Sequence, residues 1–506
     1  MSSSSADVKG NIFLGEKTIG TFTSIVYTMN NLCGPGMLGL SLVYQQAGWL
    51  ITTAIILISA IVSGAAATML CEAMALIPGN SRFQTRIEFA TLVKHYYGPK
   101  SYWVCQVIYN FSLTILNIAS ILVCSQVMDA LMIFIFGASY ALELSPAFRF
   151  IQTSAQDLTP FEGAKIALSL GYLVTMIILM PMGFFNLDES AAFQLASWGI
   201  MVTALVEFIV QFFLNGLEPS RVDAIGSEFT NVVGIVIFGF AYVVTVPSWC
   251  NEKRDSVSVN RVIWISTAVS SIMFVLIGLL GALAYPNLQY ANLLTNMAAP
   301  GSPIVTQVFV YLFSLFVIGL GIPLFAIYIR LNLYVGGVCN AGWSTFWGAV
   351  FPWLFSWLLY EGDGFTKFEN WAALIINGFI NFVAPFIIFL AAKRAHRRYL
   401  MGYNEDQEVH PFDALFTKPL PNTELSDSDE SDFDDEEELG APLVGAMYEE
   451  DERRHRAVPK VVERRLGFYT VPLCLATLIT IGIFFAIIAN IYSAVVGTDL
   501  NFFYDD

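Results

Sequence analysis

The sequence NNLCGPGMLGL, from Asn30 to Leu40, interrupts the first membrane-length apolar run of the chain. Pro35 removes a backbone donor and clashes with the carbonyl one helical turn earlier, while Gly34 and Gly36 accept non-helical backbone angles. Inside a bilayer, the backbone groups that such a break exposes need partners, so irregular backbone is tolerated only beside protein or a water-filled cavity. The break therefore predicts one wall of a site within the membrane.

The composition is that of a polytopic membrane protein. Hydrophobic residues make up 56% and charged residues 13% of the 506 residues, more apolar surface than a soluble domain needs. Apolar runs of about 20 residues, which cross a bilayer core about 30 Å thick, predict an all-α protein with about eleven transmembrane helices. The runs lie at 18–46, 49–77, 101–136, 165–185, 190–215, 229–250, 260–285, 303–329, 340–360, 369–393 and 465–496.

Basic loops predict the orientation, because Lys and Arg are enriched on the cytoplasmic side. Lys and Arg residues lie in the loops after the second, sixth, eighth and tenth runs. All of these loops are cytoplasmic if the N-terminus is cytoplasmic. The chain is predicted to begin with a cytoplasmic tail (1–17) and a core of ten helices (18–398). An acidic disordered cytoplasmic insertion (399–462), an eleventh helix (463–496) and an extracellular or lumenal tail (497–506) follow.

The net charge of −16 is concentrated in the acidic insertion. Between Tyr399 and Arg456 there are 18 acidic and four Lys or Arg residues, and few aliphatic residues, so this segment cannot bury enough surface to fold alone. It is either a solvated linker or a regulatory segment. Ser426, Ser428 and Ser431 lie among acidic residues, which predicts possible cytosolic kinase or sorting partners.

A second interrupted run lies five spans after the first. Residues 237–250 read IFGFAYVVTVPSWC, punctuated by Gly239 and Pro247, with polar Tyr242 and Thr245 inside. If the first ten spans form two halves of five, the two breaks are equivalent, and paired breaks of this kind mark the midplane site of a secondary transporter. The alternative is that both breaks only kink packed helices.

The two breaks together predict a site with two backbone poles. Free amides from about Met37 onward attract a carboxylate, and free carbonyls of the preceding half-helix and the sixth span hold an ammonium group or a cation. A zwitterionic amino acid fits both poles at once. Its side chain would face Phe240, Tyr242 and Val243.

At these residues the chain resembles the amino acid/auxin permease family, within the amino acid–polyamine–organocation superfamily. The first-span match runs through Asn30, Asn31 and residues 34–40 and closes at Gly48, while Ser41 stands where the family usually has Pro. Weaker patterns involve Phe238, Phe240, Pro247, Glu252, Pro323 and Arg330.

The resemblance implies secondary transport of amino acids by a LeuT-type fold, a 5+5 inverted repeat plus one extra helix. It also implies that spans 1, 2, 6 and 7 rock against the others around the substrate. With this carried over, the predicted substrate-binding residues are Asn30, Asn31, Gly34, Pro35, Gly36, Met37, Phe240, Tyr242 and Val243.

One departure from the family concerns the coupling ion. Sodium-coupled members place hydroxyls before the eighth-span proline, where this chain has Gly319 and Gly321, and Ser314 lies about two helical turns too early. We therefore expect transport to be coupled to protons rather than to sodium, or to be facilitated exchange without a coupling ion. No cofactor is expected. An intramembrane carboxylate is the natural proton carrier, and the predicted ion-coupling residues are Glu207 in the fifth span and Asn30. Glu72 and Asp129 lie nearer span ends, where an interfacial acid is expected.

The predicted function is transport of neutral amino acids by a multi-pass protein of the plasma membrane or the vacuolar or lysosomal membrane. The alternatives are a carrier of auxin-like acids, polyamines or ions, and an amino-acid sensor that signals through the acidic segment. The four His residues and seven Cys residues form no catalytic or metal-binding spacing. We therefore expect no enzyme, no metal and no nucleic-acid partner. The expected partners are the small-molecule substrate, the lipid bilayer and the cytosolic kinases or sorting proteins at the acidic segment.

Overall fold

The computed structural model describes residues 17–501, apart from 146, 155–159, 162–165, 230–231, 287, 289–292, 300, 360–372 and 401–469. The predicted N-terminal tail up to residue 16, nearly all of the acidic insertion and the last five residues therefore lie outside the described residues.

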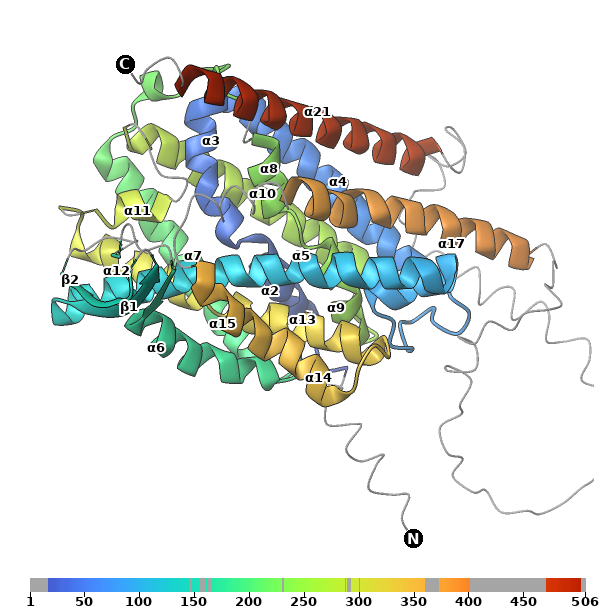
Figure 1. Cartoon of the computed structure of the whole chain (residues 1–506). Helices are drawn as coiled ribbons and strands as arrows, with labels where there is room; N and C mark the ends of the chain where they lie inside the picture. Colours follow the sequence, from blue (N-terminus) through green and yellow to red (C-terminus); the bar gives the residue numbers. More distant parts are fainter. Residues whose placement is uncertain are drawn as a thin grey trace, which may run out of the picture.

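The described chain is mostly helical (Figure 1). The α-helices are α2 (Thr21–Leu32), α3 (Leu40–Ala47), α4 (Trp49–Ala75), α5 (Phe89–Phe136), α6 (Leu170–Leu179), α7 (Ala191–Asn215), α8 (Val232–Gly239), α9 (Val246–Glu252), α10 (Val259–Ala284), α11 (Leu293–Met297), α12 (Ile304–Leu312), α13 (Gly321–Val335), α14 (Ala341–Thr345), α15 (Phe351–Ser356), α17 (Ala384–Leu400) and α21 (Thr470–Asn501). The 3-10 and π segments are η1 (Pro35–Gly39), η2 (Met180–Phe184), η3 (Pro219–Arg221), η4 (Val243–Thr245), η5 (Phe313–Ile318), η6 (Phe346–Val350), η7 (Trp357–Leu359), η8 (Ala373–Asn377) and η9 (Phe379–Val383).

Eight helical segments of the described chain are long and apolar enough to cross a membrane. They are Trp49–Ala75, Phe89–Phe136, Ala191–Asn215, Val232–Glu252, Val259–Ala284, Ile304–Val335, Leu374–His396 and Thr470–Ile488. The remaining three predicted runs are also helical but are short or broken: α2–η1–α3, α6–η2 and the pieces from α14 to η7. The multi-pass helical class is confirmed, while the number of eleven spans stays a prediction.

Unbroken helices pack against the broken ones, as α4 does against α8 and α9. α10 packs against α2, α3 and α4, whereas α5 packs against α6, α13 and α15. Close helix packing follows from small residues in the spans: the Trp264 ring of α10 lies against Gly64 of α4. α21, dark red in Figure 1, lies beside α17 at the edge of the molecule. Only 17% of the most apolar stretch of this helix is buried.

A three-stranded antiparallel sheet connects α5 to α6, and the sequence did not predict it. The central strand β1 (Ser139–Ser145) pairs with β2 (Arg149–Thr153) and with β3 (Ile166–Ser169). Alternate residues of β1 are buried, which is the two-residue period of a strand with one covered face. The predicted fourth span, 165–185, therefore begins late, at Leu170, where the Ser169 hydroxyl accepts from the Tyr172 amide and caps α6.

The third span also differs from its prediction, because its helix starts 12 residues earlier than residue 101. α5 begins at Phe89, with a kink at Gly98, whose φ of 79° is in the left-handed region, and Pro99 follows it. Residues 89–97 form a separate short helical arm before the span. Glu88, the residue that precedes α5, thus lies outside the membrane-spanning part.

Candidate functional site

The first helix breaks at the predicted place. α2 ends at Leu32, Cys33 and Gly34 are non-helical, and η1 begins at Pro35. Among the described residues, the amides of Gly34 and Gly36 donate to no backbone carbonyl. These two donors are therefore left for a side chain, water or a ligand.

The sixth predicted span is broken as well. α8 ends at Gly239, and the chain turns through η4 before α9. Neighbouring helices satisfy part of the exposed backbone: Ser63 Oγ of α4 donates to the Phe240 carbonyl at 3.0 Å, and Asn381 Oδ1 of η9 accepts from the Val244 amide at 3.1 Å. The break is thus held by protein on one side, as a break at membrane depth requires.

The two breaks touch each other. A Cβ atom added to Gly36 would lie 2.8 Å from the Cα atom of Gly239, which is closer than real Cβ atoms approach backbone. Only a residue without a side chain lets η1 and α8 meet here. A Cβ atom added to Gly34 meets nothing within 4 Å, so the break is tightly packed at one glycine and open at the other.

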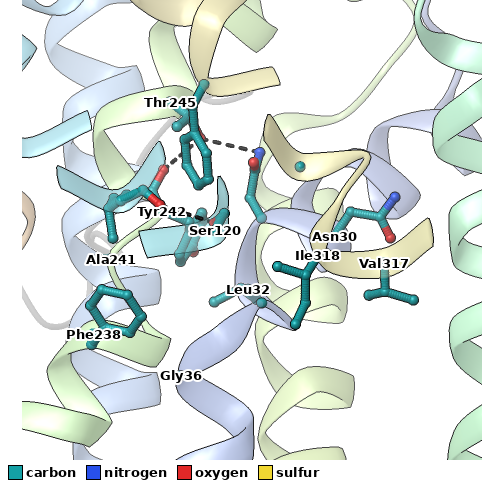
Figure 2. A pocket seen from close by; sticks show the side chains of 15 residues that line it. Asn30, Leu32, Gly36, Ser120, Phe238, Ala241, Tyr242, Thr245, Val317 and Ile318 are labelled. Carbon is teal, nitrogen blue, oxygen red and sulfur yellow. Dashed lines mark hydrogen bonds between the residues drawn. The ribbon is translucent and has the colours of Figure 1, made fainter. Parts of the chain in front are cut away.

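A small cavity lies against both breaks, between α2, η1, α5, α8 and the η5–α13 segment (Figure 2). It measures about 30 Å³, which holds one or two water molecules and is too small for an amino acid. Its polar lining residues are Asn30, Asn31, Ser120, Tyr242 and Thr245. Its apolar and glycine lining residues are Leu32, Gly34, Gly36, Leu116, Phe238, Ala241, Val317, Ile318, Gly321 and Phe325. Among the residues that the structure describes, the lining thus contains no Asp, Glu, Lys, Arg or His.

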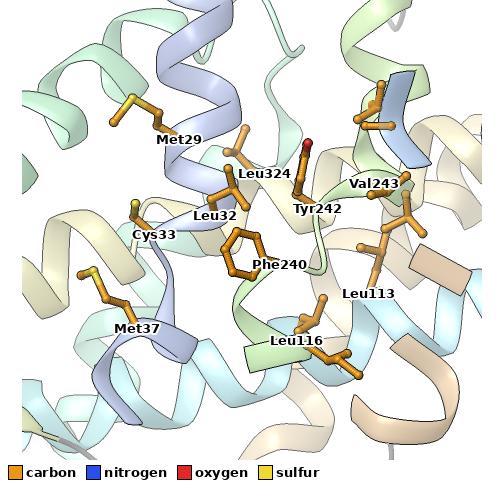
Figure 3. Close-up of a cluster of buried hydrophobic side chains, with 14 of the residues drawn as sticks. Met29, Leu32, Cys33, Met37, Leu113, Leu116, Phe240, Tyr242, Val243 and Leu324 are labelled. Atoms are coloured by element: carbon orange, nitrogen blue, oxygen red, sulfur yellow. The ribbon is translucent and has the colours of Figure 1, made fainter. Parts of the chain in front are cut away.

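Eight of the nine predicted substrate-binding residues divide into two groups. Those that line the cavity are Asn30, Asn31, Gly34, Gly36 and Tyr242. Met37, Phe240 and Val243 are fully buried and belong to the apolar cluster around the breaks, shown in Figure 3. Pro35 lies in η1 between the two lining glycines.

Asn30 connects the broken first helix to two other elements. Its Nδ2 donates to Gln194 Oε1 of α7 at 2.7 Å, and Gln194 Nε2 donates to the Leu320 carbonyl at 2.9 Å. The Asn30 Oδ1 atom is buried and accepts no hydrogen bond from the described residues. Asn30 is among the lining residues of the cavity, and a buried acceptor without a partner carries a free-energy cost that a bound donor would remove.

Asn31 makes the corresponding connection to the second break. Its Nδ2 donates to the Tyr328 hydroxyl of α13 at 3.0 Å and to Thr245 Oγ1 at 3.4 Å. In Figure 2 a dashed line at Thr245 marks the bond from Asn31 that joins the two broken segments, and another marks the bond from Thr245 to the Tyr242 carbonyl of the same segment. Tyr242, also in the lining, has its hydroxyl 3.0 Å from Thr267 Oγ1 of α10.

Sequence reasoning missed the cavity wall that α5 and the η5–α13 segment provide. Leu116 and Ser120 of α5 line it, as do Val317 and Ile318 of η5. The wide π turn at η5 was not predictable from these apolar residues. A hydroxyl in the middle of an apolar span, Ser120, was the available signal.

The candidate proton carriers lie outside the cavity lining. Thr306 of α12 donates to Glu207 Oε1 at 2.7 Å. Lys393 of α17 pairs with Glu72 at 2.5 Å. The Asp129 Oδ1 atom accepts from the Ser139 hydroxyl at 2.6 Å and from the Gly171 amide at 2.8 Å. Glu72 and Asp129 are buried within the protein, while their predicted place at the membrane interface stays a prediction.

The region of Gly319 and Gly321 is where the family resemblance leads us to look for sodium-binding hydroxyls. Backbone atoms and the Gln194 side-chain amide occupy it instead. A Cβ atom at Gly319 would lie 2.0 Å from the Leu315 carbonyl oxygen, while Gly321 lines the cavity. Ser314 is buried and does not line the cavity. The neighbouring Leu320 carbonyl is occupied by Gln194.

Three comparisons place the chain among known proteins. A family model described as "Transmembrane amino acid transporter protein" matches residues 17–335. The "Transmembrane protein 104 homolog" of Caenorhabditis briggsae is 20% identical over 323 residues, which are 59% of this chain. The chain spans 65% of the length of that curated relative.

The third comparison is with a solved structure, that of MHP1, a nucleobase-cation-symport-1 family transporter in a closed conformation with bromovinylhydantoin bound. The two chains agree with a TM-score of 0.51 at 11% identity, over 74% of this chain and 78% of the other. At this identity the likeness concerns the fold alone. It confirms the predicted LeuT-type fold.

Proposed function

Because this chain belongs to the transmembrane amino acid transporter family, we propose that it carries neutral amino acids across a membrane through the cavity at the two helix breaks. The observation that carries the proposal is the lining of that cavity, which has backbone donors and amide and hydroxyl groups but no charged side chain. A substrate with a charged side chain would lose its hydration there without gaining an ionic partner.

The cavity offers a partner to each end of a zwitterion. The free amides of Gly34 and Gly36 are donors for the carboxylate. The unpaired Asn30 Oδ1 atom is an acceptor for the ammonium group. The apolar side chains of Phe238 and Val317 then remain for the substrate side chain, which favours small or medium apolar substrates.

We further propose that transport proceeds by alternating access. A cavity of about 30 Å³ must widen to admit an amino acid, so the broken helices have to move away from α5 and α13. The inverted-repeat fold accomplishes this by rocking one group of helices against the other. We assign α2–η1–α3, α4, α8–α9 and α10 to the moving group.

We propose that the inner, cytoplasmic end is the one where Lys17, Arg86 and Lys253 lie. Two contacts bring these segments together: Lys17 Nζ donates to the Phe83 carbonyl at 2.6 Å, and Lys253 Nζ lies over the Phe83 ring at 4.8 Å. Clustered basic residues favour the cytoplasmic side.

Proton coupling or facilitated exchange is proposed over sodium coupling. A hard cation needs several oxygen ligands, and here Gln194 Nε2, a donor, already occupies the Leu320 carbonyl. Gly319 and Gly321 add no hydroxyl to the region.

The test is uptake by the purified protein in proteoliposomes. Radiolabelled Ala, Leu, Phe, Glu and Lys are offered under imposed pH and sodium gradients, with protein-free vesicles as blank. We expect uptake of the neutral substrates only, without a sodium requirement. Sodium dependence, or preferential uptake of Glu or Lys, would contradict the assignment.

A matched pair of variants ties uptake to the cavity. At both Gly321, which lines the cavity, and Gly199, on α7, an added Cβ atom meets nothing within 4 Å. Gly321→Leu should fill the cavity and abolish uptake, whereas Gly199→Leu should retain it. Equal uptake by the two variants would show that substrate binds elsewhere.

A further inference from the structure

A buried carboxyl group that sequence reasoning did not single out lies at the inner end of the molecule. Glu88, just before α5, is 2% exposed. Its Oε2 accepts from Ser248 Oγ at 2.5 Å and its Oε1 accepts from Asn251 Nδ2 at 2.8 Å. Both donors belong to α9, the inner half of the second broken helix.

The same short helix is held by further contacts to the loop before α5. Asn251 Oδ1 accepts from the Ile87 amide at 3.1 Å, and Glu252 forms an ion pair with Arg86. The Ile19 amide donates to the Glu252 carbonyl at 3.3 Å, which adds the chain before α2 to the closure. α9 therefore closes the inner end, and Glu88 binds two of its side chains.

α9 also connects Glu88 to the cavity. Ser248 follows Thr245 by three residues, which is one helical turn, and Thr245 lines the cavity and accepts from Asn31. The hydroxyls of Tyr109 and Tyr328 lie within electrostatic range of Glu88. A displacement of α9 would thus change both the cavity and the surroundings of the carboxyl group.

The surroundings of Glu88 favour its protonated form. Burial raises the pKa of the Glu88 carboxyl group from its usual 4.5 to about 7, although the bonds from Ser248 and Asn251 act in the opposite direction. Among the charged neighbours, Glu252 raises this pKa and Arg86 lowers it. If α9 moves away and water enters, the burial effect disappears and the carboxyl group becomes a stronger acid.

We propose that Glu88 is the proton-binding group of the transport cycle, protonated while α9 closes the inner end and deprotonated to cytosolic water when α9 moves away. The inference rests on the proposed function, since it assigns the coupling proton of that transport. The proton passes between water and a carboxyl oxygen, so no other reactant is needed. Glu207, the candidate from the sequence, lies on α7 and accepts a hydrogen bond from Thr306 of α12, and neither element is one of the two broken segments at the cavity.

The first experiment compares three carboxyl-to-amide variants in proteoliposomes with acid outside. Wild type should show uptake stimulated by the proton gradient and acidification of a trapped pH dye. Glu88→Gln should lose both effects and keep counterflow exchange at zero gradient. Glu207→Gln and the matched exposed variant Glu228→Gln should behave as wild type. Gradient stimulation that survives in Glu88→Gln, or disappears in Glu207→Gln instead, would overturn the inference.

A second measurement does not depend on transport. Because the pKa of Glu88 is higher in the folded protein than in the unfolded chain, its stabilising contribution is complete below about pH 4.5 and is lost as the pH rises towards about 7. The difference in melting temperature between wild type and Glu88→Gln should therefore change across this interval. A constant difference would overturn the assignment even if neutral amino acids are transported, whereas absent uptake with a changing difference would contradict the proposed function alone.

Discussion

The two ends of the central cavity are closed by opposite kinds of contact. On the side proposed to be outer, glycines let helices approach closely: Gly36 meets Gly239, and a Cβ atom at Gly281 of α10 would lie 2.5 Å from Ser41 Oγ of α3. On the inner side, charged and polar groups join α9 to the loop before α5, with the Arg86–Glu252 ion pair among them. The outer closure therefore depends on volume, whereas the inner closure depends on charge.

The largest effect is expected from breaking the inner ion pair. The Glu252 side chain is only 1% exposed, so Arg86→Gln leaves a buried carboxylate without its partner, which costs about 3–5 kcal/mol in buried pairs. We expect a large fall in the melting temperature in detergent. Arg86→Gln combined with Glu252→Gln should recover part of the loss, because it removes the unpaired charge. If the double variant is less stable than Arg86→Gln, the pair does not have this role.

A smaller effect is expected from adding volume at the outer closure. In Gly36→Ala the new Cβ atom would lie 2.8 Å from the Gly239 Cα atom, and overpacking of this kind typically costs about 1–3 kcal/mol. The melting temperature should fall, and the size of this fall should be the same at pH 5 and at pH 8. Gly34→Ala is the matched control for stability, since its Cβ atom meets nothing within 4 Å. Equal melting temperatures for the two variants would mean that the breaks do not touch.

The outer closure was more predictable from the sequence than the inner one. Gly34, Pro35 and Gly36 act through local backbone chemistry, which the sequence states directly, and α2 does end just before them. The prediction could extend to Gly239 because the fold repeats its broken span. What it could not supply is the close approach of Gly36 to Gly239, which depends on how two distant helices pack.

Glu88 illustrates why the inner closure was missed. The residue lies in a polar loop, where an acid is normally solvated, and its burial depends on Ser248 and Asn251, which lie 160 or more residues away. Gln194 was overlooked for the same reason, since only the fold brings it between Asn30 and Leu320. The strands β1 and β3 pair across about 20 intervening residues, a separation that short alternating segments do not disclose.

The smallest effect is expected from an exposed charge pair at the same inner end. Lys17 Nζ lies 3.8 Å from Asp255 Oδ1, and the Asp255 side chain is 57% exposed, so the pair is worth less than about 1 kcal/mol. Asp255→Asn should barely change the melting temperature, because Lys17 keeps its 2.6 Å bond to the Phe83 carbonyl. Raising the salt concentration should affect wild type and variant alike. A loss as large as that of Arg86→Gln would mean that the number of charges at this end, rather than the burial of Glu252, stabilises the inner closure.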